Sequence, residues 1–196
     1  METILKLATV SFATVAYLII ILGIFFKGNT LNAVTWILWT ILDLFALYGT
    51  WKKGEDLTLL MTFCIGTGLV ALLLLIKGQF VWNNTARKIS YLVLLCIIVI
   101  LFGNENNVVW ASSIAVFAAG IPYLSELWNK LVVDKSTTTA NTLFFLTTLC
   151  SVFLAYSTKM SLVFSVTCFM YWIIAMFISL KVPEVIPFDD PNESDV

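Results

Sequence analysis

Seven runs of apolar residues, each close to twenty residues long, alternate along the chain with short polar segments. The runs cover about 4–26, 31–51, 57–76, 86–103, 107–128, 138–157 and 160–180. At 1.5 Å of rise per residue, a helix of this length crosses the roughly 30 Å hydrocarbon core of a bilayer. The first run is too long for the core of a signal peptide, so we count it as a helix. The pattern predicts an all-α polytopic membrane protein with seven transmembrane helices.

The composition agrees with this pattern and excludes several classes of protein. Of the 196 residues, 60% are hydrophobic and 12% are charged, and the mean hydropathy is +0.97. A soluble domain of this size cannot bury so much apolar side chain. The net charge of -1 gives no basic field to attract nucleic acid. Membrane lipid is therefore the expected surrounding partner.

The same inventory argues against enzymatic or metal-dependent chemistry. The chain has no histidine, and its four cysteines form no C-x-x-C pair. This pattern favours neither a zinc site nor a disulfide framework. We also find no pairing of a nucleophile with a base and no phosphate-binding loop. The sequence predicts a protein that is not an enzyme and that needs no cofactor.

The distribution of Lys and Arg predicts how the helices cross the membrane. With seven spans, the side of the N-terminus collects Lys6, Lys52, Lys53 and Lys159, and the opposite side collects Lys27, Lys77, Arg87, Lys88, Lys130, Lys135 and Lys181. Because basic residues favour the cytoplasmic side, we expect an outside N-terminus and a cytoplasmic C-terminus.

The chain also repeats itself weakly. A shift of 104 residues aligns Thr35 with Thr139, Cys64 with Cys168, Ala71 with Ala175 and Lys77 with Lys181. The boundaries of the first three apolar runs coincide with those of the last three, which leaves the fourth run over. The predicted units are a first three-helix repeat (1–85), a linker helix (86–103), a second three-helix repeat (104–181) and a disordered acidic tail (182–196). Such a 3+1+3 plan is a parallel repeat of the kind some transporters have.

Two short motifs in the second repeat carry a family resemblance. Gly120-Ile121-Pro122-Tyr123-Leu124 resembles a proline-glutamine signature, and Lys135-Ser136-Thr137 resembles the K-S-T that follows it. Together with the helix plan, they make the chain similar to the SWEET and PQ-loop superfamily of seven-helix membrane proteins. The chain departs from the pattern at Tyr123, which stands where the signature has glutamine. The third and seventh runs also lack the asparagine that the sugar carriers have there. The resemblance implies a bacterial-type member of unknown substrate in the plasma membrane.

Asp43 is the candidate site residue with the strongest physical argument. A carboxylate at mid-membrane costs about 2.5–3.5 kcal/mol, so it should face the bundle interior or a wet cavity. It could couple transport to protons or bind a cationic group, or it could only fix packing through a neighbouring hydroxyl. Trp36 and Trp39 share its helical faces and could hold a sugar ring or a cation. The alternative for Trp36 is an interfacial anchor, because it lies one turn into its span.

Three further residues complete the predicted site. Thr67 and Tyr171 align at the 104-residue shift, and we expect them to line a central cavity from the third and seventh spans. The neighbouring Gly66 is better explained by close helix packing. Pro122 interrupts the hydrogen bonds of the fifth span, so it is either a hinge or a static kink.

The functional expectation is a membrane transporter of a small polar solute that works by alternating access, with proton coupling as an option. The alternative is a non-transporting membrane scaffold or a receptor-like protein, for which Asp43 would be occluded and no central cavity would exist. The sequence leaves open whether the protein forms a homo-oligomer and which solute it handles.

Overall fold

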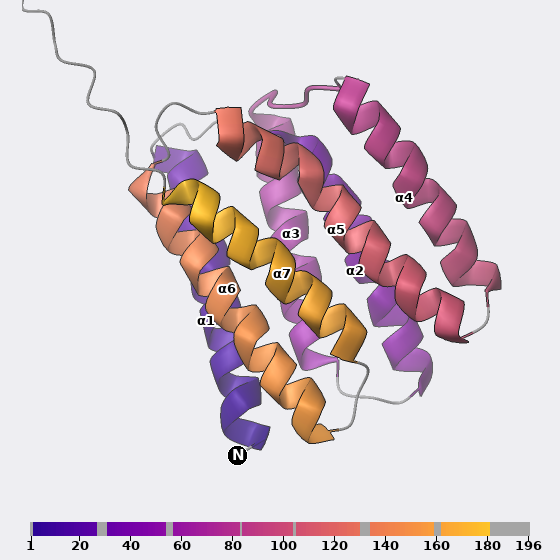
Figure 1. Cartoon of the computed structure of the whole chain (residues 1–196). Coiled ribbons are helices and arrows are strands. Elements are labelled where there is room, and N and C mark those ends of the chain that lie inside the picture. Colours follow the sequence, from indigo (N-terminus) through magenta and orange to yellow (C-terminus); the bar gives the residue numbers. More distant parts are fainter. Residues whose placement is uncertain are drawn as a thin grey trace, which may run out of the picture.

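The described part of the chain folds into seven helices that follow the seven predicted spans. The computed structural model describes residues 2–26, 31–53, 57–82, 84–103, 105–129, 134–158 and 162–180. The helices are α1 (Glu2–Phe26), α2 (Ala33–Lys53), α3 (Thr58–Ile76), α4 (Asn84–Phe102), α5 (Glu105–Asn129), α6 (Lys135–Thr158) and α7 (Leu162–Ser179) (Figure 1). The predicted all-α class is confirmed, and each span boundary agrees with a helix end to within a few residues. The predicted acidic tail lies outside the described residues.

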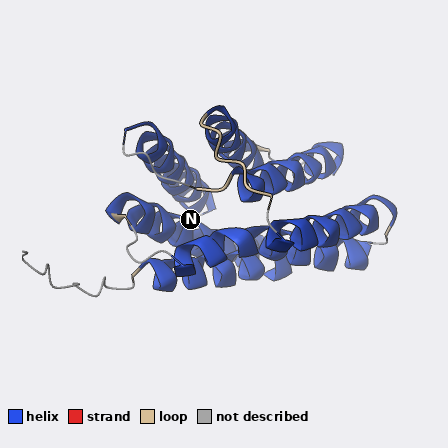
Figure 2. Ribbon diagram, turned by 90° about the horizontal axis from the view of Figure 1, so that it is seen from above, coloured by secondary structure: helices blue, strands red, loops and turns tan. Residues whose placement is uncertain are grey.

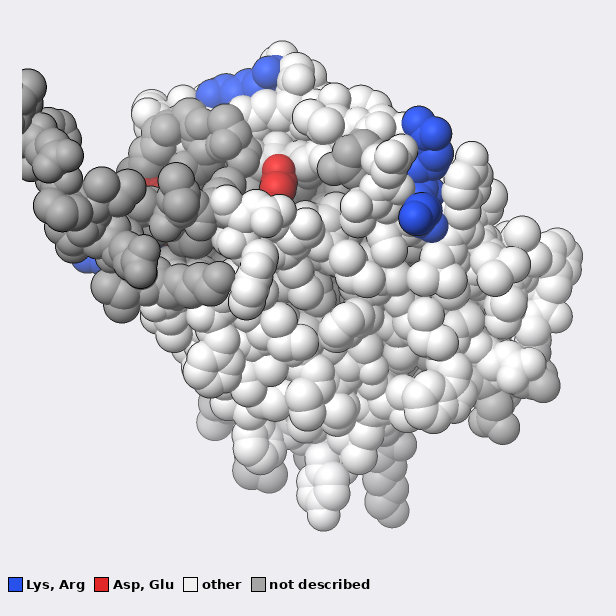
Figure 3. Space-filling model, turned by 45° about the horizontal axis from the view of Figure 1, so that its top comes forward, with Lys and Arg blue, Asp and Glu red and all other residues white. Residues whose placement is uncertain are grey.

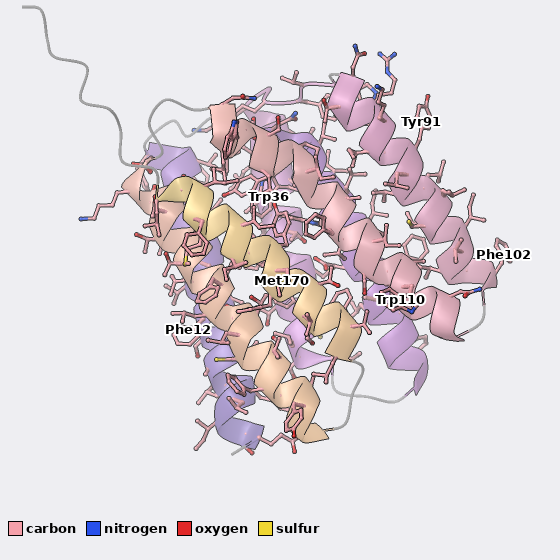
Figure 4. All side chains as sticks on the ribbon, viewed as in Figure 1. Phe12, Trp36, Tyr91, Phe102, Trp110 and Met170 are labelled. Atoms are coloured by element: carbon pink, nitrogen blue, oxygen red, sulfur yellow. The ribbon has the colours of Figure 1, made fainter. Side chains whose placement is uncertain are left out.

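Five of these helices are long and apolar enough to cross a membrane. They are α1, α3, α4, α6 up to Tyr156, and α7. The apolar part of α2, Ala33–Tyr48, is shorter. Large apolar side chains remain exposed on all seven helices. On α4, Tyr91 and Phe102 project from the outer side of the bundle, whereas Trp36 lies inside it (Figure 4). Such a surface is typical of helices that face lipid.

The helices pack in two layers, with α4 to α7 in one and α1 to α3 in the other (Figures 1 and 2). In the layer of α1 to α3, α3 contacts both α1 and α2. In the layer of α4 to α7, α7 contacts both α5 and α6. The layers meet where α1 packs along α6 and where α2 packs against α5. Helix α4 lies at the edge, against α5 and part of α2.

Small residues allow the closest of these contacts. Ala13 and Ala16 on α1 are fully buried, as are Ala115 and Ala119 on α5 and Ala140 on α6. Residues of this size let membrane helices approach each other closely and gain van der Waals contact along their length.

Hydroxyl side chains in the helices are mostly satisfied locally. Thr9, Thr40 and Thr148, for example, each donate to the carbonyl oxygen four residues earlier. This bond lets a polar side chain sit in an apolar helix at little cost. It also means that most Ser and Thr residues here have no hydroxyl proton to spare for a ligand.

Backbone hydrogen bonds join the start of α2 to the turn that follows α3. Gly78, at a φ of 69°, ends α3 in a turn where its own N–H bonds to Leu75 and the Gln79 N–H bonds to Leu74. A left-handed residue at this position is usually glycine, because glycine has no Cβ to clash. The carbonyl of Gln79 then accepts the N–H of Ala33, the first residue of α2, at 2.9 Å.

Candidate functional site

Asp43 lies midway along α2 and contacts a hydroxyl on the adjacent helix α3. Its Oδ2 is 3.0 Å from the Thr67 Oγ1. The same Thr67 oxygen is 2.9 Å from the carbonyl oxygen of Phe63, one turn earlier on α3. The structure therefore brings together two of the predicted site residues. A Thr hydroxyl bound to Asp43 is the arrangement that the packing interpretation expected.

Asp43 is half-buried where α2 packs against α3. The ionisable groups close enough to interact with its charge are Tyr17 on α1, Cys64 on α3 and Cys168 on α7. All three are acids that are neutral in their protonated form. The Lys and Arg side chains that the structure describes, such as Lys77 and Arg87, lie near helix ends, and Lys6 pairs with Glu2 in the first turn of α1. No basic side chain balances the carboxylate among these residues.

Rings from six of the seven helices meet beside this carboxylate. We call this set the aromatic cluster; its members are Tyr17, Trp36, Trp39, Phe63, Phe117, Tyr123, Phe144, Tyr171 and Trp172. Its ring centroids lie 4.4–6.5 Å apart, the range in which aromatic pairs attract each other. Helix α4 contributes no described ring to it. The centre of the bundle is thus filled with aromatic side chains.

Trp36 and Trp39 lie in the middle of the aromatic cluster. Their ring centroids are 5.3 Å apart and nearly perpendicular. Trp39 donates its indole N–H to the Val116 carbonyl on α5 at 3.1 Å. Trp36 is 0% exposed, so the interpretation of Trp36 as an interfacial anchor is wrong. An anchor residue must reach the membrane surface, and Trp36 instead faces Tyr17 and Tyr123.

Two buried polar atoms beside this cluster have no hydrogen-bond partner among the described residues. They are the indole nitrogen of Trp36 and the hydroxyl oxygen of Thr35, both buried on α2. Leaving a buried polar group unpaired costs about 1–3 kcal/mol, so such groups need an explanation. They lie in the first turn of α2, three and four residues after Asn32, which lines the cavity described below.

Tyr171 takes part in packing and does not point toward Thr67. Its hydroxyl donates to the Gly120 carbonyl on α5 at 3.1 Å, and its ring lies against Trp39. An added Cβ on Gly120 would overlap the Tyr171 ring, and one on Gly66 would overlap the Tyr17 ring. In both layers, a tyrosine on one helix therefore occupies the space that a glycine leaves on another. The expected packing role of Gly66 agrees with this contact.

A second buried polar group joins α5, α6 and α7. The Tyr123 hydroxyl donates to Asn141 at 2.8 Å, and the Asn141 amide donates to the Ser179 hydroxyl at 3.1 Å. Ser179 in turn donates to the Ala175 carbonyl at 2.6 Å. The chain of bonds satisfies every member, and such fully paired networks fix the relative position of the helices that carry them.

A cavity among the described residues has a volume of about 500 Å³ and opens at the end of the bundle where α2 begins and α5 ends. Its polar lining includes Asn32, Gln79, Ser125 and Glu126, and Pro122 borders it. Figure 3, which looks toward this end, shows acidic atoms among uncharged side chains, with Lys and Arg farther out. Asp43, Trp36, Trp39, Thr67 and Tyr171 do not line this cavity.

Glu126 and Asn32 connect the two sides of the cavity. The Asn32 N–H donates to Glu126 Oε2 at 3.1 Å. The Asn32 side chain caps α2 by accepting the Val34 N–H at 3.1 Å, and it bonds to both N–H and C=O of Val81.

Sequence reasoning missed several of these residues, and only some had a readable signal. An Asn directly before an apolar helix is a typical N-cap, so Asn32 was identifiable. Tyr17, Phe144 and Trp172 belong to runs that are apolar on all sides, where periodicity does not show which face is buried. No three His, Cys, Asp or Glu side chains come together to hold a metal ion in the described part of the chain.

Comparison of the chain with protein-family models, with curated proteins and with solved structures finds no match.

Proposed function

We propose that the protein is an integral membrane transporter that moves a small polar solute by alternating access. The observation that carries this proposal is the cavity of about 500 Å³ between α2 and α5. Its volume lies within the range of small-molecule sites, about 300–1,000 Å³. Its amide, hydroxyl and carboxylate groups suit a solute that is polar and rich in hydrogen-bonding groups.

The packing order of the helices supports a 3+1+3 parallel repeat. Helix α3 lies between α1 and α2, and α7 lies in the same way between α5 and α6. If the two triplets are exchanged, the α1–α6 contact becomes the α5–α2 contact, and both are present. Helix α4 is the connector, and it stays outside the aromatic cluster. Alternating access would then rock one triplet against the other around the central rings.

Pro122 is placed to serve as the hinge of this motion. It borders the cavity, and the next residue, Tyr123, belongs to the aromatic cluster. A proline inside a helix removes one backbone hydrogen bond and weakens the helix at that point. Bending there would move the end of α5 away from α2 and let the cavity extend toward the rings.

Trp36 supports a solute contact deeper in the bundle. Its indole N–H has no partner among the described residues. A solute oxygen that reached it would recover the free energy that the unpaired donor costs. Trp39, whose N–H is already bound, would contribute a ring wall, and Asp43 would supply polarity or a proton. Thr67 would act through Asp43, and Tyr171 would hold Trp39 in place.

The orientation we propose puts the cavity on the cytoplasmic side of a bacterial plasma membrane. Lys77 ends α3, Arg87 and Lys88 lie in the first turns of α4, and Lys135 starts α6, and these helix ends lie at the same end of the bundle as the start of α2. Because cytoplasmic ends collect basic residues, the N-terminus is then outside and the C-terminus inside.

One observation favours the alternative of a non-transporting scaffold or receptor-like protein. Asp43 is bonded to Thr67, and the centre of the bundle holds aromatic rings. A static protein would have the same features. The cavity and the unpaired Trp36 donor have no role in that alternative, which is why we favour transport.

A thermal-shift screen tests the proposal. Purified protein is heated with sugars, amino acids and small cations at acidic and neutral pH. A solute at one hundred times its Kd stabilises the folded state by about 2.7 kcal/mol, which raises Tm by several degrees. Solutes that raise Tm are then assayed for uptake into proteoliposomes.

Two variants give this screen its control. Trp36→Phe keeps the ring but removes the donor, so it should weaken solute binding roughly 2- to 10-fold. Trp110→Phe changes an indole that is 61% exposed and should leave binding unchanged. A panel in which no solute raises Tm or enters the proteoliposomes would contradict the proposal and favour the scaffold.

A further inference from the structure

The Thr67 hydroxyl faces more acceptors than it has protons. Its oxygen is 3.0 Å from Asp43 Oδ2, 2.9 Å from the Phe63 carbonyl oxygen and 3.4 Å from the Cys64 carbonyl oxygen. A threonine hydroxyl carries a single proton to donate, and a carbonyl oxygen can only accept. If Asp43 were an ionised carboxylate, it too could only accept. The shortest two contacts could then not both be full hydrogen bonds.

A proton on Asp43 satisfies the whole arrangement. The carboxyl O–H donates to the Thr67 oxygen, and the Thr67 hydroxyl donates to the Phe63 carbonyl. Each of the two shorter contacts, to Asp43 and to the Phe63 carbonyl, then has one donor and one acceptor, and the longer contact to the Cys64 carbonyl needs no proton of its own. Thr148 shows the same local geometry without a carboxylate: its hydroxyl is 3.1 Å from the Phe144 carbonyl oxygen and 3.0 Å from that of Phe145. The backbone bond is therefore the usual state of a buried threonine here.

The charges around Asp43 point the same way. Among the described residues, the ionisable groups whose charge interacts with that of Asp43 are Tyr17 on α1, Cys64 on α3 and Cys168 on α7. Each of them gains negative charge when it ionises, so none stabilises a carboxylate. No Lys or Arg that the structure describes forms an ion pair with Asp43.

We infer that Asp43 carries a proton in this conformation and that Thr67 is its positioning residue: the Thr67 oxygen accepts the carboxyl O–H, and the Thr67 hydroxyl donates a hydrogen bond to the Phe63 carbonyl. When the proton leaves, the Thr67 hydrogen turns from Phe63 to the carboxylate. The two protonation states thus differ by the rotation of one hydroxyl. The inference rests on the proposed function only for the role of this proton in transport. The proton itself is observable without any solute.

Infrared spectroscopy of the purified protein in lipid tests the inference. A protonated carboxyl group has a C=O band separate from that of a carboxylate. At neutral pH, the wild-type spectrum should contain this band and the Asp43→Asn spectrum should lack it. In Thr67→Val the band should persist at a shifted frequency, because the carboxyl O–H loses its acceptor. In Thr67→Ser and Thr148→Val the band should keep its position.

Two outcomes would overturn the inference. If Asp43→Asn removes no carboxyl band from the wild-type spectrum, Asp43 is ionised and Thr67 donates to it. If the Asp43 carboxyl band keeps its frequency in Thr67→Val, the carboxyl O–H donates to a group other than Thr67. If Asp43→Asn does not fold, ¹³C labelling of aspartate side chains in the wild type replaces it: a band that does not move on labelling would assign the proton to a glutamate.

The result is separable from that of the transport assay. A carboxyl band in a protein that moves no solute would leave the inference standing and remove the proposed function. Solute uptake by a protein whose Asp43 is ionised would do the reverse.

Discussion

Gly66 and Gly68 lie two residues apart on α3 and make opposite predictions when each is replaced by alanine. A Cβ on Gly66 would overlap the Tyr17 ring, whereas a Cβ on Gly68 would lie 3.6 Å from the Thr40 Cγ2, an ordinary contact. Tyr17 is 6% exposed, and its ring is enclosed by those of Trp36, Phe63 and Phe144. A shift of the Tyr17 ring would therefore press on these neighbouring rings.

The expected magnitudes follow from two opposing effects. Alanine in a helix interior is favoured over glycine by roughly 0.5–1 kcal/mol, and both variants gain this. Gly66→Ala also forces the Tyr17 ring to shift, and overpacking of a core costs typically about 1–3 kcal/mol. The difference between the two variants isolates the overlap, so Gly66→Ala should be about 1–3 kcal/mol less stable than Gly68→Ala. For a chain of 196 residues this corresponds to roughly 2–12 °C in Tm.

Thermal unfolding in detergent, followed by intrinsic fluorescence, measures this difference. Tyr17→Leu should restore part of the stability that Gly66→Ala loses, because it removes the ring that the new methyl group displaces, and a double-mutant cycle gives the coupling free energy. Equal stability of Gly66→Ala and Gly68→Ala would refute the reasoning. So would an absence of coupling between Gly66 and Tyr17.

Three other outcomes follow from the structure and the proposal. Tyr123→Phe should lose about 1–2 kcal/mol, because Asn141 loses its donor in a dry interior, while Tyr91→Phe on the outer face of α4 should be neutral in the same unfolding assay. Asp43→Asn should fold and abolish any pH dependence of solute uptake into proteoliposomes; an unchanged pH profile would remove its coupling role. A cysteine tag at the C-terminus should resist a membrane-impermeant maleimide added to intact cells, and labelling from outside would contradict the seven-span orientation.

The helix pattern was readable from the sequence because the hydrocarbon core sets a length that each span must meet. The run predicted at 57–76 became α3 at Thr58–Ile76, and its end was marked by Lys77 and Gly78. The largest difference lies at the start of α6, where Lys135-Ser136-Thr137 are polar but helical. Asp134 caps this helix by accepting the Ser136 N–H at 3.1 Å, a local signal that hydropathy does not contain.

The site was only partly readable, for a physical reason. The rarity of a carboxylate in an apolar run singled out Asp43, but its partner depends on which face of α3 meets α2. Thr67 was named for its alignment with Tyr171, and these two residues instead have separate partners, Asp43 and Gly120. In a span that is apolar on all sides, the buried face depends on how well the side chains of neighbouring helices fit together, as in the contact of Tyr17 with Gly66. Shape complementarity between helices is not encoded at any fixed spacing.

The turn after α3 has a mechanical consequence for any motion at that end of the molecule. Ala33 donates to Gln79, and Asn32 bonds to both backbone groups of Val81, so the first turn of α2 and this turn form one rigid block. Of the Asn32 bonds the structure gives, the one that crosses to α5 joins its N–H to Glu126. If α5 moves away from α2, the block keeps its internal hydrogen bonds, and the bond between Asn32 and Glu126 breaks. The amide hydrogen of Asn32 would then exchange with solvent at a rate set by the opening of α5. The neighbouring amide hydrogens of Ala33 and Val81 would stay protected, because their bonds lie within the block.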